Sequence, residues 1–154
     1  MASIELDAEL LSNIHGKTVL ITGAVGGIGM EIVRLYSYHG ANVVIADLEN
    51  TRSAAEKLIA TLPDPSRAIF VQANTLIWNE MKELFSIAVK TFGSIEVVVA
   101  NAGVMENHMT LDVETVDSNG DLLEATEASK VIDINVKGTL NSKSRQFEFL
   151  LPVI

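Results

Sequence analysis

The sequence predicts an α/β fold, an incomplete, doubly wound parallel sheet of about four strands with flanking helices. Two observations indicate it. Four short apolar runs alternate along the chain with segments of helical periodicity, and a glycine-rich stretch, "TGAVGGIG" (residues 22–29), joins the first run to the first helical segment. Strands separated by single helices pair in parallel through right-handed crossovers, which places helices on both faces of the sheet.

The strands are expected at residues 17–22, 41–46, 68–73 and 95–100. The first run, "KTVLIT", is short and rich in β-branched residues, which is typical of a strand buried on both faces. The second run, "ANVVIA", ends at Asp47, and the other two, "AIFVQA" and "IEVVVA", are equally apolar. These runs therefore predict a sheet that helices cover on both faces.

The first helix is expected directly after the glycines and ends near Gly40, a plausible C-terminal stop. Its predicted buried face follows positions i, i+4, i+7 and i+8, which are Ile28, Ile32, Leu35 and Tyr36.

Two further helices separate the later strands. One is expected over residues 51–62 and is closed by the turn of residues 63–65. The other ends at Gly93 and carries an apolar stripe, formed by Trp78, Met81, Phe85, Ala88 and Phe92.

The segment after the fourth strand has a different character. Residues 105–127 contain seven acidic residues and no Lys or Arg, with a turn signal at Asn119–Gly120. This composition predicts an irregular, solvated excursion. A helical pattern resumes over residues 125–140.

Length and composition exclude several classes. The 154 residues fit a single domain, and the net charge of −9 without any basic run argues against a nucleic-acid partner. No stretch approaches the roughly 18 apolar residues of a membrane-spanning helix, and the N-terminus lacks the pattern of a secretory signal. There are no cysteines, and the three histidines show no metal-ligand spacing, so no metal site is expected. The sequence predicts a cytoplasmic protein that does not bind membranes.

The glycine-rich stretch follows a strand and opens a helix, which is the context of a dinucleotide-binding loop. Gly23 permits the tight turn out of the strand, and Gly27 and Gly29 lack a Cβ, so a pyrophosphate can approach the helix N-terminus. The spacing is G-x3-G-x-G rather than G-x-G-x-x-G. Such a cluster alone also fits an ordinary glycine turn, but the order of strand, loop and helix favours phosphate binding.

Asp47 points to the kind of dinucleotide. It lies 18 residues after Gly29, near the offset at which a carboxylate binds a ribose 2′-hydroxyl. A carboxylate there repels the 2′-phosphate of NADP, and neither Leu48 nor Gly26 supplies a cation beside it. These features predict NAD rather than NADP. The alternative is that Asp47 is a solvated strand-end acid or a helix cap.

Three motifs together resemble the short-chain dehydrogenase/reductase family: "GKTVLITGAVGGIG", then "VVVANAG" (residues 97–103), then "VIDINVKGT" (residues 131–139). The resemblance covers residues 15–142 and implies a Rossmann-type dinucleotide-binding domain. Residues 1–14 are interpreted as a leader, and residues 143–154 as a divergent apolar tail. The chain is expected to be the cofactor-binding portion of such an enzyme, truncated before its active site.

The resemblance implies roles for ten residues. The residues expected to line the cofactor pyrophosphate are Gly23, Gly27, Ile28 and Gly29, with Asp47 on the adenosine ribose. Those expected beside the adenosine are Asn101, Ala102 and Gly103. Asn74 stands where the family commonly has an Asp against the adenine, and its amide oxygen can still accept a bond from the exocyclic amine. Asn135 would orient a water of the proton relay through its backbone carbonyl, although taken alone it fits an ordinary polar residue of a helix.

The family's chemistry depends on a Ser, a Tyr and a Lys, the last two spaced Tyr-x-x-x-Lys. The Lys lowers the pKa of the Tyr, and the phenol exchanges a proton with the substrate while hydride moves. The two tyrosines of this chain, Tyr36 and Tyr38, lie in the first helix, and neither has a Lys at that spacing. Asn135 is therefore the only catalytic candidate among these residues.

The sequence thus predicts, by family, an NAD-dependent oxidoreductase of an alcohol or ketone that binds NADH but is inactive alone. The alternative is a non-catalytic NAD-binding or regulatory module, or a partner of a full-length homologue. A Rossmann-like domain for another adenosine ligand, such as S-adenosylmethionine, is disfavoured by the glycine spacing and by Asn101. The substrate and the oligomeric state are left open.

Overall fold

A computed structural model describes residues 12–106, 116–122 and 124–150. A four-stranded parallel sheet in the order β3-β2-β1-β4 forms its centre. The strands are β1 (Thr18–Thr22), β2 (Asn42–Asp47), β3 (Ala68–Gln72) and β4 (Val97–Val99). All four predicted strands are therefore present, and the parallel, doubly wound arrangement is confirmed.

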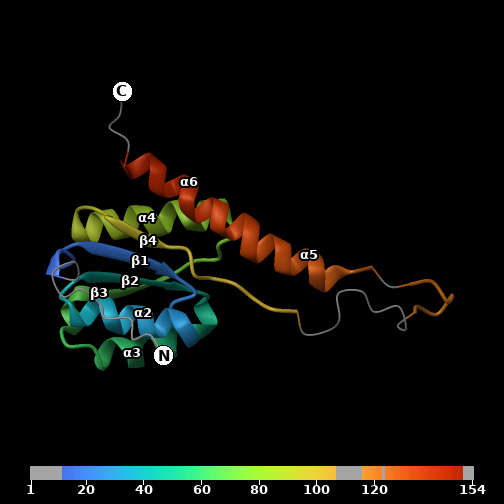
Figure 1. Ribbon diagram of the computed structural model, residues 1–154, viewed down its shortest axis with the longest axis horizontal. Helices are drawn as coiled ribbons and strands as arrows, with labels where there is room; N and C mark the ends of the chain where they lie inside the picture. Colours follow the sequence, from blue (N-terminus) through green and yellow to red (C-terminus); the bar gives the residue numbers. More distant parts are fainter. Residues whose placement is uncertain (1–11, 107–115, 123, 151–154) are drawn as a thin grey trace, which may run out of the picture.

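Helices cover both faces of the sheet, as Figure 1 shows. On one face lie α2 (Gly27–Tyr38) and α3 (Arg52–Ala60), and on the other lie α4 (Trp78–Phe92) and α6 (Gly138–Leu150). Short 3-10 turns, η1 (Glu49–Thr51) and η2 (Pro65–Arg67), flank α3. The helix α5 (Thr126–Ile132) runs into α6 through a single π-helical turn, η3 (Asp133–Lys137).

The strand register brings the carboxyl ends of the strands to one edge of the sheet. Thr22 lies opposite Ala46 in β2, and Asp47 lies opposite Gln72 in β3. Ile21 lies opposite Val99, the last residue of β4. The glycine-rich loop, Asp47 and the segments after β3 and β4 therefore meet at this edge, where ligands bind in open α/β sheets.

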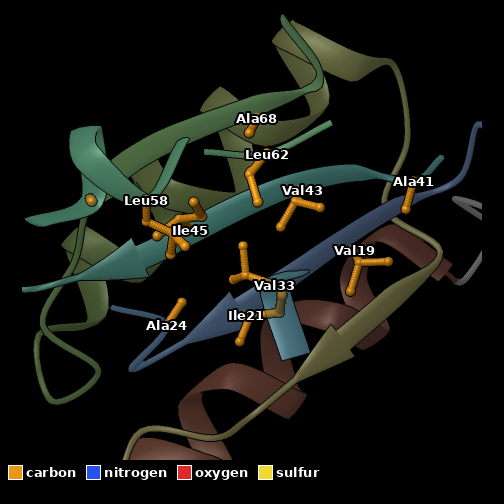
Figure 2. Packing of buried hydrophobic residues seen from close by; sticks show 11 residues of the cluster. Val19, Ile21, Ala24, Val33, Ala41, Val43, Ile45, Leu58, Leu62 and Ala68 are labelled. Atoms are coloured by element: carbon orange, nitrogen blue, oxygen red, sulfur yellow. The ribbon is translucent and has the colours of Figure 1, made fainter. Parts of the chain in front are cut away.

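The alternation of side chains along β1 divides the core into two clusters. Val19 and Ile21 face α2 and α3, where they pack with Val33 and Leu58, while Leu20 faces α4. Figure 2 shows the first cluster gathered around β1 and β2. All five residues of β1 are buried, as expected for a strand covered on both faces.

The buried face of α2 differs in part from the prediction. Its buried residues are Gly29, Val33 and Ser37, whereas the side chain of Ile28 is 75% exposed and that of Leu35 is 38% exposed. The reason is the close approach of the helix to the loop at Gly29, described below, because this contact fixes which side of the helix faces the sheet. Ile32 and Tyr36 are partly buried and pack against the first core cluster, so the prediction is right for these two residues and wrong for Ile28 and Leu35.

The other predicted helices are close to the observed ones. Met81, Phe85 and Ala88 are buried in α4 as predicted, while Trp78 at its first turn is 43% exposed. Gly93, with φ +89°, ends this helix, and Gly40, with φ +77°, follows α2. These two glycines occupy the left-handed region that side chains disfavour.

The last helix crosses the boundary that the sequence placed after residue 142. Helix α6 continues to Leu150, and Ser142 is fully buried within it. A Cβ at Gly138 would lie 2.6 Å from Oγ1 of Thr75, so the glycine lets α6 approach the segment between β3 and α4 closely. The amide of Asn141 donates to the carbonyl of Thr75 at 2.7 Å and fixes the same contact.

The acidic excursion is described only in part. Val116 and Leu122 form an isolated antiparallel bridge around a turn in which Gly120 has φ +85°, so the turn predicted at Asn119–Gly120 is confirmed. The carboxylate of Asp117 accepts bonds from the backbone amides of Asn119 and Asp121, and these bonds hold its pKa below the ordinary value. Residues 107–115 and 123 lie outside the described part, as do residues 1–11 of the predicted leader.

Glu96 extends the pairing of β1 with β4 by a side-chain contact. Its carboxylate accepts a bond from the backbone amide of Thr18 at 2.7 Å. Burial alone would raise the pKa of Glu96, but hydrogen bonds from the Ser94 side chain and the Thr18 amide outweigh it and hold the pKa below its ordinary value.

Glu96→Gln is expected to lower the free energy of unfolding at pH 7 by about 0.5 kcal/mol, because the side chain is solvent-exposed. A lowered folded pKa contributes stability above the unfolded pKa of about 4.3, and this contribution is lost as the pH falls through the folded value. Urea unfolding at pH 7 and pH 3 should show variant and parent converging in acid. Glu83→Gln, on the exposed face of α4, is the control and should leave the free energy of unfolding unchanged at both pH values.

Candidate functional site

A cavity of about 220 Å³ opens at the carboxyl edge of the sheet. It is lined by the loop after β1, the end of β2, the segments after β3 and β4, and the π turn η3. The lining residues are Gly23, Asp47, Leu48, Ala73, Asn74, Thr75, Leu76, Ala102, Gly103, Val104 and Ile134. Five of the ten predicted site residues are therefore brought together there, from four separate segments of the chain.

The glycine-rich loop is held close to the end of β4. Gly23 has φ +63°, and a Cβ on it would lie 2.7 Å from Cα of Ala102. A Cβ on Gly29 would lie 2.2 Å from the carbonyl oxygen of Gly23. Both glycines are thus required by backbone packing, independently of any ligand.

Gly26 and Gly27 face open space instead. A Cβ at either position would have no heavy atom within 4 Å among the residues that the structure describes. The amides of Gly27, Ile28 and Gly29 belong to the first turn of α2, whose N–H groups have no acceptor within the helix. The loop therefore presents backbone donors without an acceptor in the helix, and a positive helix end, beside the open space at Gly26 and Gly27, which suits an anion such as a pyrophosphate.

Asn101 fixes this loop from the end of β4. Its Nδ2 donates to the carbonyl of Thr22 at 3.1 Å and to that of Gly23 at 2.9 Å. The next residue, Ala102, donates its amide to Oγ1 of Thr22 at 3.1 Å. Asn101 does not line the cavity, so its observed contacts are those of a brace between the two strand ends.

Asp47 lies where the loop and the second strand end meet. Its Oδ2 accepts a bond from the amide of Val25 at 3.0 Å, and its Oδ1 accepts one from the amide of Leu48 at 2.8 Å. Each carboxylate oxygen has a second lone pair, so both can still accept from a hydroxyl. These bonds orient the carboxylate toward the cavity that it lines.

Asn74 uses its side chain locally. Its Oδ1 accepts from the amide of Leu76 at 3.0 Å, and its own backbone amide donates to Oε2 of Glu80 at 2.8 Å. The predicted acceptor is thus partly engaged by the chain, and one lone pair of Oδ1 is left for a ligand.

Asn135 lies in the π turn and contacts the segment after β4. Its Oδ1 accepts from the amide of Val104 at 2.8 Å, and its Nδ2 donates to the carbonyl of Val104 at 2.9 Å. The backbone carbonyl of Asn135 accepts from Oγ1 of Thr139 at 2.8 Å. The side chain thereby holds Val104 in the cavity wall.

A second, shallower cavity of about 560 Å³ adjoins the first. The two share Gly23, Asp47 and Gly103, and the second extends toward the start of α3 through Asn50, Thr51 and Ala54. Asp47 therefore stands between two volumes, one on the β3 side and one on the α3 side.

Arg52 directly follows Thr51, which lines this second cavity, but its side chain is bonded to Glu49. Its Nε and Nη2 donate to the two carboxylate oxygens of Glu49 at 2.6 and 2.8 Å, and its guanidinium carbon lies 4.8 Å from the ring centre of Phe70. The hydrogen bonds from Arg52 hold the pKa of Glu49 below its ordinary value.

The sequence did not identify the apolar walls of the first cavity. These walls are formed by Leu48, Leu76, Val104 and Ile134. An apolar side chain does not by itself indicate a binding site, so the only available signal was their position close to predicted site residues. Thr22 was also missed as a polar contributor. Its place immediately before Gly23 was the available signal.

Neither a metal-binding cluster nor a membrane-spanning helix is found in the described part of the chain. No group of three or more His, Cys, Asp or Glu side chains is placed to hold a metal ion there. No helix within the described ranges has the length and apolar character needed to cross a membrane.

Known proteins share this architecture. A family model described as short chain dehydrogenase matches residues 17–151. A short-chain dehydrogenase/reductase of Penicillium rubens is 31% identical over 140 residues, which span 91% of this chain and 38% of that protein.

Two solved structures from Brucella melitensis are also similar. One is a short-chain dehydrogenase/reductase described as a glucose/ribitol dehydrogenase, with TM-score 0.74 and 26% identity over 88% of this chain and 53% of that one. The other is a 3-ketoacyl-(acyl-carrier-protein) reductase complexed with NADH, with TM-score 0.71 and 25% identity over 88% of this chain and 51% of that one. This chain thus spans about half the length of these two structures and 38% of the length of the fungal relative.

Proposed function

This chain belongs to the short chain dehydrogenase family, and from that premise we propose that it binds NAD(H) at the carboxyl edge of its sheet. The whole protein would then transfer hydride between the nicotinamide and an alcohol or ketone. The observation that carries the proposal is the placement of Asp47, whose carboxylate is oriented by two backbone amides between the two cavities. A cytoplasmic location is proposed with it.

The residues present fit the two polar parts of a dinucleotide. The carboxylate of Asp47 retains lone pairs for the hydroxyls of a ribose, and the first turn of α2 offers backbone donors to a pyrophosphate. The apolar walls Leu48, Leu76 and Val104 suit the faces of an adenine ring. When bound, the nicotinamide supplies the hydride chemistry.

The preference for NAD over NADP is an electrostatic argument. A 2′-phosphate would place about two negative charges beside the carboxylate of Asp47. In the described residues that line either cavity there is no Lys or Arg to offset them. A 2′-hydroxyl, in contrast, donates a hydrogen bond to the same carboxylate.

We further propose that these residues alone bind the cofactor without catalysing turnover. The 154 residues contain no Tyr-x-x-x-Lys, so neither phenol of the chain is paired with a Lys for proton exchange with a substrate oxygen. The backbone carbonyl of Asn135 would hold a water of the proton relay. That water can pass on a proton only where a paired Tyr and Lys supply or accept it. The same absence favours the second candidate function, a non-catalytic NAD-binding module or a partner of a complete homologue.

Two measurements on the purified chain test these proposals. Titration of NADH, followed by nucleotide fluorescence, should give saturable binding. Alcohol oxidation with NAD should give no turnover. Absence of NADH binding would overturn the proposed function, whereas turnover without an added partner would overturn only the proposed inactivity.

Asp47→Asn is expected to weaken NADH binding about tenfold, because an amide cannot replace the charged acceptor of two ribose hydroxyls. The affinity for NADPH should fall less, since repulsion of the 2′-phosphate is removed as well. The measurement is a pair of fluorescence titrations with NADH and NADPH.

Asp64→Asn is the matched control for this variant. Asp64 also accepts a bond from a backbone amide, that of Ser66, but it precedes β3 at the opposite edge of the sheet. Its replacement should leave both affinities unchanged. Equal losses of NADH affinity in the two variants would contradict the role assigned to Asp47.

A further inference from the structure

The second cavity has room for a group attached to the ribose. It measures about 560 Å³ and lies beside Asp47 on the side of α3. Under the proposed function, Asp47 would bind the 2′-hydroxyl of the adenosine ribose, and this volume beside the same carboxylate would offer space for a 2′-phosphate. Space alone therefore does not exclude NADPH, and the discrimination depends on charge.

Arg52 is the cation nearest to Asp47 along the chain. It directly follows Thr51, which lines the second cavity, and consecutive Cα atoms are only about 3.8 Å apart. An arginine at this position has a stem long enough to turn toward the cavity. A guanidinium that did so would offer a fork of donors to a phosphate.

In the structure Arg52 is not among the residues that line the second cavity. Both carboxylate oxygens of Glu49 accept from its guanidinium, at 2.6 and 2.8 Å, and the group lies over the ring of Phe70 at 4.8 Å. Phe70 belongs to β3, the outer strand of the sheet. The bidentate bond and the ring contact together hold the cation at the sheet edge.

We propose that Glu49 is a specificity-determining residue of the cofactor site, because it withholds Arg52 from a 2′-phosphate and so favours NADH over NADPH. Glu49 is a positioning residue that acts through Arg52, and Arg52 is a latent phosphate ligand. The inference rests on the proposed function, since it requires that a nicotinamide dinucleotide binds beside Asp47.

The test is a double-mutant cycle with NADH and NADPH as probes. Glu49→Gln removes the bidentate acceptor and should raise the affinity for NADPH about fivefold, the effect of a partly solvated charge pair, with less than a twofold change for NADH. Because Arg52 carries the gain, Glu49→Gln should have no such effect in a chain that also carries Arg52→Gln. The gain should also shrink at 0.5 M salt, where exposed charges are screened.

Glu31→Gln is the matched control. Glu31 forms the same i,i+3 ion pair with Arg34, but on α2 and away from both cavities that Asp47 lines. It removes one negative charge and should leave the ratio of the two affinities unchanged. Thermal melting of each variant checks that it is folded.

The outcomes separate the two claims. Unchanged NADPH affinity in Glu49→Gln, with NADH binding intact, would overturn the inference and leave the proposed function standing. A gain that persists without Arg52, or that Glu31→Gln reproduces, would reduce the effect to general charge repulsion and also overturn it. Failure of the parent chain to bind NADH would overturn the proposed function and the inference together.

Discussion

Gly29→Ala is expected to lower the free energy of unfolding by about 3 kcal/mol, the upper end of what overpacking costs. A Cβ at this position would lie 2.2 Å from the carbonyl oxygen of Gly23 and 2.7 Å from Nδ2 of Asn101. Neither neighbour can move aside freely, because that amide already bonds the same carbonyl oxygen. Helix α2 would have to retreat from the sheet and loosen the packing of its buried Val33.

Gly26→Ala is the matched control in the same loop. Gly26 has φ −130° and ψ 159°, a conformation open to alanine, and a Cβ there meets no heavy atom of the described residues within 4 Å. Its unfolding free energy should stay within about 0.5 kcal/mol of the parent. Urea unfolding of the three proteins measures the difference. Equal losses in the two variants would contradict the steric role of Gly29.

Asn101→Asp is expected to cost about 3 kcal/mol at pH 7, although it changes the volume of the side chain very little. The Nδ2 that donates to the carbonyls of Thr22 and Gly23 would become an oxygen, and an ionised carboxylate would face two carbonyl oxygens without a proton between them. The brace between the ends of β1 and β4 would then repel the loop that it now holds.

The sign of the pH dependence follows from this repulsion. The fold disfavours the ionised form, so the pKa of the introduced carboxyl is raised above its unfolded value of about 3.9. The destabilisation is therefore full above the folded pKa and is lost as the pH falls toward the unfolded one, because the protonated carboxyl donates again. Urea unfolding of parent and variant between pH 7 and pH 4 should show the two converging.

Asn79→Asp serves as the control for charge alone. Asn79 is exposed in the first turn of α4, where a negative charge is tolerated by the helix dipole. This variant should match the parent within about 0.5 kcal/mol at each pH. A loss in Asn101→Asp that did not diminish in acid would show that its cause is something other than the lost donor.

Local patterns were sufficient for the architecture of this chain. The apolar runs located all four strands, and Gly40 and Gly93 marked where α2 and α4 end. These features depend on a residue and its near neighbours. A buried strand appears in the sequence as an apolar run, and a turn that needs a positive φ appears as a glycine. The fourth strand is nevertheless shorter than expected, with only Val97–Val99 paired.

The contacts that build the site could not be predicted in the same way. Asn101 donates to the carbonyls of Thr22 and Gly23, which lie 79 and 78 positions earlier in the chain. The sequence around Asn101 does not indicate these partners. The buried face of α2 was predicted only in part, because the apolar pattern located Ile32 and Tyr36 but not the close approach of the helix to the loop at Gly29. The π turn at residues 133–137 also has no counterpart in the apolar pattern of that segment.

That π turn has a consequence for how the gene for this chain can change. A π turn is an α-helix that carries one additional residue, as the bond from the amide of Gly138 to the carbonyl of Asp133 records here. An in-frame loss of one codon within 133–137 would make the helix more regular. The residues beyond the turn, including Gly138 beside Thr75, would stay nearly in place, because the amide of Gly138 would bond the same carbonyl in the ordinary α-helical way. The residues inside the turn would shift, and the bonds between Asn135 and Val104 would be lost. At this point a deletion that improves the helix would spoil the cavity wall.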